Sequence, residues 1–415
     1  METLQIMGQK AKAASKEIMR LGTKEKNEIL VACSKALSQA TGRILEANRQ
    51  DLDTARNKNM KESLIDRLLL TEERITAISS AMIDVAKLED PISEVEYLKE
   101  MPNGLKIGKK RVPMGVIGMI YESRPNVTPD AFSLCFKAGS ACILKGGSDA
   151  FHSNFAISEI LRATLEKLGY NPDFVQLISD TSREVTENFM KLSEYLDLLI
   201  PRGGAALIQS VVKNATVPVI ETGTGNCHIF IDESADLARA IEIVINAKIT
   251  RPGTCNSLEK VLVHEKIAAQ FLPDLAKSLK SHSVSVRACE KSLSYFEGAK
   301  IATEDDWYLE FLDMIIGVKI IPGIDEAINH IEKYSSHHSE AILTESYTNS
   351  QKFLNEVDSA AVYVNASTRF TDGFEFGFGA EIGISTQKMH ARGPMGLKEL
   401  TSNKFIIYGS GQIRE

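Results

Sequence analysis

The sequence predicts an α/β fold with two doubly wound domains and a small strand-based element. The chain has 415 residues, of which 43% are hydrophobic and 25% charged, so it is long enough to bury more than one core. From Val112 onward, short apolar runs alternate with amphipathic stretches of helical length. Strands separated by helices need crossover connections, and these produce parallel sheets that are covered on both faces.

The first roughly 100 residues are predicted to be all-helical, because their apolar residues recur at helical spacing. The run Ile29, Leu30, Cys33 and Leu37 is an example. Further helices are predicted from Thr128-Pro129, over 153–168, after Ser182 and near 235–249. The predicted strands are 116–121, 141–145, 174–178, 197–200, 217–220, 260–264, 317–321 and 361–365.

These elements predict a division of the chain into three parts. Residues 1–103 and 114–221 form a cofactor-binding domain with a helical N-terminal segment, and residues 222–390 form a catalytic domain. Residues 104–113 and 391–415 include two stretches, GLKIGKKRVP and TSNKFIIYGS, that alternate like exposed strands. Exposed strands tend to pair with other chains, so we expect this element to build a homo-oligomer.

Bulk properties exclude several classes of partner. The net charge of −7 offers no basic field for nucleic acid, and the sequence contains neither a signal-peptide core nor an apolar run that spans a bilayer. We therefore expect a cytoplasmic protein with no nucleic-acid or membrane partner. The six cysteines lack C-x-x-C spacing and the eight histidines form no ligand motif, so no metal is expected. His337 and His338 are predicted to be surface residues.

Cys255 is the strongest candidate for catalysis. It lies in the loop RPGTCNS between a predicted helix and a predicted strand. Backbone N–H groups and the charge of Arg251 would favour its thiolate there. An unselected cysteine is more commonly buried and inert, and we keep that interpretation for the other five, which are Cys33, Cys135, Cys142, Cys227 and Cys289.

Other candidates follow predicted strands. Glu221 begins the turn ETGTGN, whose glycines would let the backbone approach a ligand, and it is either an acid/base or a solvated turn residue. Lys145 begins a Lys-Gly-Gly stretch that could hold phosphate, although the signal is weak. Arg124 and Asn126 precede a helix whose amino terminus favours anions, where an ordinary capping loop is the more common case. The fingerprint G-x-G-x-x-G is absent, so no cofactor follows from that motif.

Together these pieces resemble the aldehyde dehydrogenase superfamily. Glu221 precedes Cys255 by 34 residues, the interval found in that superfamily, and PRGG and FGFGAEIGIS resemble its later landmarks. The stretches MIYESRPNVTPDA, ETGTGNCHIFID, RPGTCNSLEKVLVH and ISTQKMHARGPMGL look like those of the γ-glutamyl phosphate reductases of proline biosynthesis. The resemblance covers nearly the whole chain.

The resemblance implies the reaction and its residues. Cys255 would attack L-glutamyl 5-phosphate, release phosphate and hold the acyl group as a thioester, which hydride from the cofactor reduces to L-glutamate 5-semialdehyde. Asn126 and the Cys255 N–H would stabilise the oxyanions. The cofactor-binding residues would be Lys145, Gly146, Gly147, Ser148, Gly203, Gly204 and Glu310. Arg124, Arg251 and Arg392 would bind the substrate's anions. A separate glutamate kinase would supply the substrate and is a possible transient partner.

Two further expectations concern the cofactor and Glu221. Members of the superfamily that use NAD often carry a glutamate just after the lysine, whereas Gly146, Gly147 and Ser148 follow Lys145 here, so NADPH is expected. In hydrolytic relatives the glutamate activates water, a step that phosphate release does not need, so Glu221 is expected to contribute at most modestly. The alternatives are a hydrolytic NAD(P)-dependent aldehyde dehydrogenase, which needs no phosphate, and a non-catalytic relative.

Overall fold

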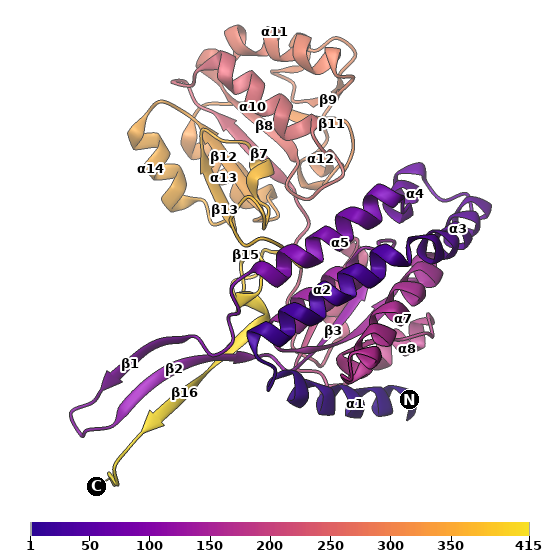
Figure 1. The fold of residues 1–415 in the computed structure, drawn as a ribbon. Helices are drawn as coiled ribbons and strands as arrows, with labels where there is room; N and C mark the ends of the chain where they lie inside the picture. The colour runs from indigo at the N-terminus through magenta and orange to yellow at the C-terminus, as the bar shows by residue number, and fades with distance from the viewer. Residues whose placement is uncertain (1, 415) are drawn as a thin grey trace. The chain divides into compact units, whose positions relative to one another are not determined.

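The computed structural model describes residues 2–414, and its backbone contacts divide the chain into two compact units (Figure 1). Unit 1 comprises Met1–Thr222, Gly377–Gly383 and Met395–Glu415, and unit 2 comprises Gly223–Phe376 and Ile384–Pro394. Of the strand-based element expected at 104–113 and 391–415, residues 104–113 and 395–415 fall in unit 1 and residues 391–394 in unit 2. In the part of the chain described, no helix is both long and apolar enough to cross a bilayer.

Unit 1 is built on a parallel sheet of four strands. Their order is β5 (Val175–Leu177), β4 (Ala141–Gly146), β3 (Val116–Tyr121) and β6 (Leu198–Arg202). Every residue of β3 and β4 is buried, which agrees with their unbroken apolar sequence. The chain moves outward from β3 to β5 and then returns to the other side of β3 as β6. Loops at the carboxyl ends of β3 and β6 therefore flank the point at which sheets of this type bind ligands.

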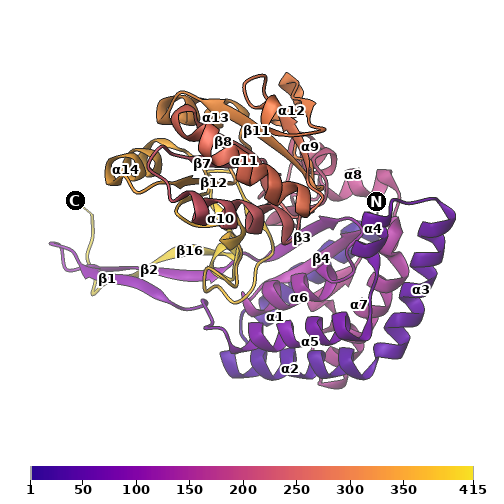
Figure 2. The ribbon, with the colours of Figure 1, turned by 90° about the horizontal axis from the view of Figure 1, so that it is seen from above.

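Helices cover both faces of this sheet. Helix α1 packs on β3, β4 and β5, while α6 packs against β3 and β4 and α7 against β5. Helices α2, α3 and α5 form an outer layer on α6 and α7, as Figure 2 shows. The helices of unit 1 are α1 (Glu2–Ile18), α2 (Thr23–Gln39), α3 (Thr41–Asn57), α4 (Glu62–Leu68), α5 (Glu72–Lys87), α6 (Val127–Lys137), α7 (Phe151–Lys167), α8 (Arg183–Phe189) and α9 (Ala205–Asn214).

Unit 2 contains a parallel sheet of seven strands. Their order is β10 (Lys300–Ile301), β9 (Ser285–Ala288), β11 (Ile315–Ile321), β8 (Leu258–His264), β7 (Cys227–Ile231), β12 (Ser339–Leu343) and β13 (Ala361–Val364). The helices are α10 (Leu237–Ile249), α11 (Glu265–Ser281), α12 (Glu304–Tyr308), α13 (Ile324–Tyr334) and α14 (Tyr347–Glu356). A short antiparallel pair, β14 (Ile384–Ser385) and β15 (Gly393–Pro394), completes the unit.

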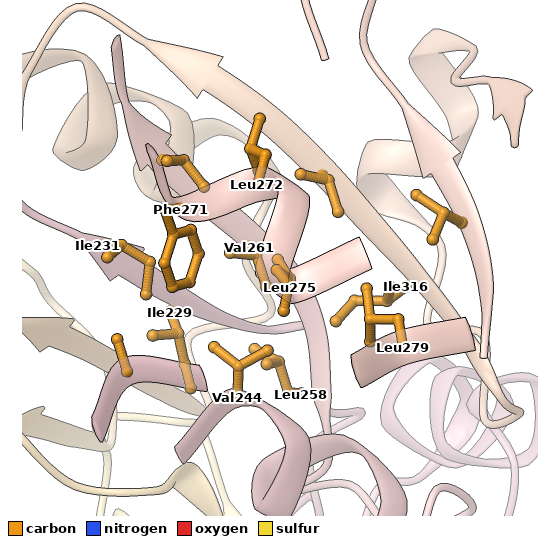
Figure 3. Close-up of a cluster of buried hydrophobic side chains, with 14 of the residues drawn as sticks. Ile229, Ile231, Val244, Leu258, Val261, Phe271, Leu272, Leu275, Leu279 and Ile316 are labelled. Carbon is orange, nitrogen blue, oxygen red and sulfur yellow. The ribbon is translucent and has the colours of Figure 1, made fainter. Parts of the chain in front are cut away.

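The sheet of unit 2 separates two hydrophobic cores. Ile229 and Ile231 of β7 lie with Val261 of β8 in the core beneath α10 and α11, which Figure 3 shows. Phe230, between the two isoleucines, lies in the second core with residues of α13 and α14. Successive side chains of a strand point to opposite faces, so an apolar strand supplies both cores.

A three-stranded antiparallel sheet extends from unit 1 and is named the arm here (Figure 1). It consists of β1 (Val95–Glu100), β2 (Lys106–Pro113) and β16 (Thr401–Tyr408), with β2 in the centre. Both stretches predicted as exposed strands are strands. The prediction that the N-terminal segment is entirely helical is wrong at β1, where pairing with β2 fixes an exposed, charged and alternating sequence as a strand.

One predicted strand, 217–220, is reduced to a single bridge between Val219 and Leu199. Pro218 supplies its carbonyl to the Leu199 N–H at 2.8 Å but has no N–H of its own, so the ladder does not continue. The other predicted strands form, with ends shifted by up to a few residues. The α/β prediction with two parallel sheets and a small antiparallel sheet is therefore confirmed.

Candidate active site

The candidate residues of unit 1 gather at one edge of its sheet. Asn126 follows β3, Lys145 ends β4, and Gly203 and Gly204 follow β6. These three strands are neighbours and parallel, so their carboxyl ends lie side by side. The loops that the sequence singled out separately therefore belong to one edge of the sheet.

Lys145 is a buried cation at that edge. Its side chain is only 3% exposed, and its Nζ donates to the carbonyl of Gly146 at 3.2 Å. Burial lowers the pKa of Lys145, while the charge of Asp180 opposes that change. No carboxylate directly follows Lys145 in the sequence, but the fold brings the charge of Asp180 near it from the loop after β5. Burying a positive charge is unfavourable unless a negative charge compensates it, so a buried ammonium is suited to binding an anionic ligand.

Packing requires glycine at two positions of this edge, Gly146 and Gly203. A Cβ at Gly146 would overlap the Asn154 amide, and one at Gly203 would overlap the carboxylate of Glu122. Glu122 also accepts a hydrogen bond from the Gly204 N–H at 3.0 Å, at the amino terminus of α9. Gly147 has only ordinary contacts. The sequence analysis did not single out Glu122, although it is a carboxylate directly after a buried strand.

Asn126 lies at the first turn of α6 and does not cap that helix. Its amide donates to the Asp130 carboxylate at 3.0 Å, which uses one of its two hydrogens. Burial raises the pKa of Asp130 to about 6, and the bond from Asn126 and the charge of Arg202 work against this. Arg124 on the same loop and Glu221 near the end of unit 1 are both half-buried.

The candidate residues of unit 2 lie at the amino ends of its strands, whereas those of unit 1 lie at the carboxyl ends. Cys255 precedes β8, and Glu310 precedes β11, so both loops lie at the amino ends of adjacent parallel strands. The turn that contains Gly225 precedes β7, the other neighbour of β8. The candidate residues of unit 2 therefore do not lie at the carboxyl ends of its strands, where sheets of this type usually bind ligands.

Cys255 differs from the other cysteines in its surroundings. It is half-buried in two consecutive turns, closed by the Thr254 N–H to the Arg251 carbonyl at 3.2 Å and the Ser257 N–H to the Thr254 carbonyl at 3.0 Å. All six cysteines are free thiols. Four are buried, and burial raises the pKa of Cys33 to about 12 and that of Cys227 well above its ordinary value. Cys289, the other half-buried thiol, is hydrogen-bonded to Ser292.

The backbone of Cys255 packs directly against the ETGTGN turn. A Cβ at Gly225 would overlap the Cys255 carbonyl, and the Cys227 thiol donates to that carbonyl at 3.1 Å. A Cβ at Gly223 would likewise overlap Thr386. We expected these glycines to let the backbone approach a ligand. Both glycines have a packing reason as well, because each makes room for the protein itself.

Glu310 is held from both sides. Its carboxylate accepts the Gly225 N–H at 2.7 Å. The residues around it are anchored to β8, where the Lys260 ammonium donates to the Leu309 carbonyl at 2.8 Å and the Glu259 carboxylate accepts the Phe311 N–H at 3.1 Å. Both anchoring side chains are fully buried, a signal that was visible as two charges within the apolar run LEKVLVH.

Burial acts on these two anchors in opposite directions. It raises the pKa of Glu259 to about 7 and lowers that of Lys260 to about 8, and the attraction between the two charges opposes both changes. The Lys248 ammonium, also fully buried, lies 3.4 Å from Glu259. The resulting network fixes the loop that carries Glu310 relative to β8, the strand that Cys255 precedes.

The arginines of unit 2 differ in their roles. Arg251 is exposed, and its carbonyl closes the first turn of the Cys255 loop. Arg392 is paired with Asp358, whose carboxylate and carbonyl accept from it at 2.7 and 2.8 Å. A third arginine, Arg369, reaches the Cys255 loop and was not among the candidates. Its sequence, ASTRF, is an unremarkable turn, and only the fold brings it there.

The histidines require one correction. His337 is exposed as predicted, but His338 is completely buried, with its Nδ1 2.8 Å from the Ser339 hydroxyl. Because β12 begins at Ser339, the preceding residue already lies inside the sheet layer. No group of three or more potential metal ligands occurs among the residues described.

The edge of unit 1 fits a nicotinamide dinucleotide in part. Lys145 offers a buried positive charge, and Gly147 leaves open backbone beside it. The Glu122 carboxylate at the start of α9 does not suit an anion, so a phosphate at this helix terminus requires Glu122 to turn away. The edge of unit 2 offers a thiol, a fixed carboxylate and two arginines, a combination suited to acyl transfer.

Known proteins match the chain over its full length. The aldehyde dehydrogenase family model matches residues 2–292. γ-Glutamyl phosphate reductases of Clostridium perfringens and Clostridium beijerinckii are 57% and 58% identical, over 409 residues (99% of each chain) and 414 residues (100% of each chain) respectively. The crystal structure of γ-glutamyl phosphate reductase from Thermotoga maritima superposes with a TM-score of 0.96 at 51% identity, covering 99% of this chain and 100% of that one. The chain therefore belongs to the aldehyde dehydrogenase family and, within it, to the γ-glutamyl phosphate reductases.

Proposed function

We propose that this reductase of proline biosynthesis converts L-glutamyl 5-phosphate into L-glutamate 5-semialdehyde and phosphate through a thioester on Cys255, with NADPH as reductant. The observation that carries the assignment of Cys255 is its place among the six cysteines. It is a half-buried thiol in a braced loop that begins at Arg251, while four of the others are buried and Cys289 is bonded to Ser292.

The chemistry follows from a thiolate and an acyl phosphate. The Cys255 sulfur attacks the acyl carbon, a C–S bond forms, and the C–O bond to phosphate breaks. When bound, the cofactor supplies a hydride to the thioester carbon, after which the C–S bond breaks and the thiolate is restored. Asn126 and the Cys255 N–H are the proposed oxyanion donors, and Arg124, Arg251 and Arg392 the proposed partners of the substrate's anions. Glu221 has no required step, because no water enters the reaction.

The test is an assay in the reverse direction. NADP⁺ reduction is followed at 340 nm with L-glutamate 5-semialdehyde, with and without phosphate, for the wild type, Cys255→Ala and the matched control Cys289→Ala. We expect turnover that requires phosphate and Cys255 but not Cys289. Turnover without phosphate would indicate a hydrolytic aldehyde dehydrogenase, and full activity of Cys255→Ala would contradict the assignment of the nucleophile. If neither the wild type nor the variants were active, we would conclude that the protein is a non-catalytic relative.

The preference for NADPH rests on the residues around Lys145. A buried ammonium favours the additional phosphate of NADPH, and Gly146, Gly147 and Ser148 place no carboxylate directly after it. The negative charge of Asp180 acts on the Lys145 ammonium and partly offsets its positive charge. We expect Lys145→Ala to lose at least about tenfold in affinity for NADPH, the size of one charged hydrogen bond, with little change for NADH. Dissociation constants measured by quenching of cofactor fluorescence test this, and an unchanged ratio of the two constants would refute it.

Two partners complete the proposal. The substrate is a mixed anhydride that water hydrolyses, so a separate glutamate kinase must supply it. Transient contact with that kinase would limit the loss of substrate by hydrolysis.

We also propose a homo-oligomer formed through the arm, because β1 and β16 are its two edge strands and carry exposed apolar side chains.

A further inference from the structure

Arg369 contacts both neighbours of Cys255. It lies on a short 3₁₀ turn, Thr368–Phe370, after β13. One guanidinium nitrogen donates to the Thr254 hydroxyl at 2.9 Å and also to the Asn256 side-chain carbonyl. The Thr254 hydroxyl donates in turn to the same Asn256 carbonyl at 3.0 Å. A single side chain thus joins the residues on either side of the thiol.

The contact is reciprocal. The Asn256 amide donates to the backbone carbonyls of Arg369 at 3.2 Å and Thr371 at 2.9 Å, and the Thr368 hydroxyl donates to the backbone carbonyl of Asn256 at 2.8 Å. Asn256, Thr368 and Thr371 are all buried. Five hydrogen bonds therefore connect the Cys255 loop with the turn that carries Arg369, and the Arg369 guanidinium donates two of them.

The turn itself has a rigid support. The Thr371 hydroxyl lies 2.6 Å from the Ser339 hydroxyl at the start of β12 and 2.7 Å from the Tyr363 hydroxyl on β13. Two strands of the sheet thus support the turn that carries Arg369, and the bonds to Thr254 and Asn256 hold its guanidinium. A side chain held in this way can place a charge without first paying the entropy of its own ordering.

The charge of Arg369 acts on the thiol. Burial and the nearby charge of Arg251 lower the pKa of Arg369, while the charge of Cys255 acts in the opposite direction. Its Nε is buried and, among the residues described, has no hydrogen-bond partner. A guanidinium that is partly desolvated beside another cation is stabilised by a nearby anion, and a thiolate is such an anion.

We propose that Arg369 is a positioning residue for Cys255, which holds Thr254 and Asn256 and places its positive charge beside the sulfur so that the thiolate is favoured. The inference rests on the proposed role of Cys255 as the nucleophile. It adds a residue that the reaction scheme above does not contain.

The experiment measures the rate at which iodoacetamide alkylates Cys255 in the full-length protein as a function of pH, by mass spectrometry. For Arg369→Gln, we expect the midpoint of this profile to move upward by about one pH unit, because a neighbouring opposite charge shifts a thiol by at least that much. At a pH below both midpoints, alkylation then falls about tenfold. Arg239→Gln is the matched control, since Arg239 is an exposed arginine of α10, and it should leave the profile unchanged.

Two more variants separate the charge from the hydrogen bonds. Arg369→Lys keeps the charge but cannot make both hydrogen bonds. The midpoint of its alkylation profile should therefore lie close to that of the wild type, while kcat falls about tenfold. Thr254→Val removes one acceptor and keeps the charge, so its midpoint should equal that of the wild type. A wild-type kcat in Arg369→Lys would overturn the proposal even if Arg369→Gln does not fold.

The outcomes also distinguish this proposal from the one before it. If Cys255 of the wild type reacts no faster than Cys289, its role as the nucleophile is wrong. If Cys255 reacts selectively but Arg369→Gln leaves its profile unchanged, only the role of Arg369 is wrong. A higher KM for phosphate in Arg369→Gln with an unchanged profile would make Arg369 a phosphate ligand, which also overturns the positioning role.

Discussion

Three buried histidines in unit 2 remain uncharged at neutral pH. Burial lowers the pKa of His338 to about 4, and it also lowers the pKa values of His228 and His330 well below their ordinary value. The Nε2 atoms of all three are buried and lack a partner within the described part of the chain. A lowered histidine pKa means that the unfolded chain binds the proton first as pH falls, so each histidine destabilises the fold in acid.

For His338 the pH window is defined. Its pKa is about 4 in the fold and 6.5 when unfolded, so the stability it contributes is complete above pH 6.5 and is lost as pH falls toward 4. Between pH 7 and pH 5 the wild type should lose about 2 kcal/mol from this group, a loss that His338→Gln avoids. Urea unfolding followed by fluorescence of Trp307, the single tryptophan, measures it in unit 2.

The comparison is between acid sensitivities and not between absolute stabilities, because His338→Gln also changes packing at pH 7. The exposed His282 provides the matched control, and His282→Gln should lose as much as the wild type. Equal losses in the wild type and His338→Gln would show that His338 is not the acid-sensitive group.

At the scale of elements, the active-site edge of unit 2 depends on close backbone contact between loops. Gly225 lies between two of them, since its N–H donates to Glu310 and its Cα faces the Cys255 carbonyl. β7, β8 and β11 are neighbours in the sheet, so the loops before them are held at strand spacing. A side chain at Gly225 therefore has to displace the loop that carries the thiol.

We expect Gly225→Ala to lower kcat by about 100-fold, because a shift of about an ångström in a reacting group costs that much. Trp307 fluorescence should show that unit 2 remains folded. Gly42→Ala is the control, since a Cβ at this position of α3 would enter open space, and alanine favours a helix. Normal turnover in Gly225→Ala would show that the loop contact is not needed for catalysis.

At the scale of the whole molecule, the arm carries exposed apolar side chains on its edge strands. Phe405 and Ile407 of β16 are 63% and 61% exposed, and they lie on the same face of that strand. β16 is an edge strand with β2 on one side only. An edge strand with such a face is a template for association with a second chain.

The double variant Phe405→Lys/Ile407→Lys should therefore form a smaller assembly than the wild type, because two charges would be placed in the contact. Light scattering after size-exclusion chromatography measures the mass. Ile301→Lys, at an exposed position of the edge strand β10 in unit 2, is the matched control and should keep the wild-type mass. An unchanged mass in the double variant would exclude the arm as the interface.

The sequence by itself determined the parts of this protein that depend on local pattern. Unbroken apolar runs such as VIGMIY predict central parallel strands, because a strand covered on both faces has no polar side. The turn residues around Cys255 predict a loop between a helix and a strand, which is where Cys255 lies. Family membership was also readable, because it rests on the order of short motifs.

The tertiary structure decided which distant residues meet. Arg369 is 113 positions from Asn256 in the chain, and Glu259 and Lys260 anchor the Glu310 loop from within a strand. Pairing with β2, not local propensity, makes β1 a strand, and packing against Cys255 requires a glycine at position 225. The physical reason is that periodicity reports only on neighbours along the chain, whereas sheet order and register set which loops share an edge.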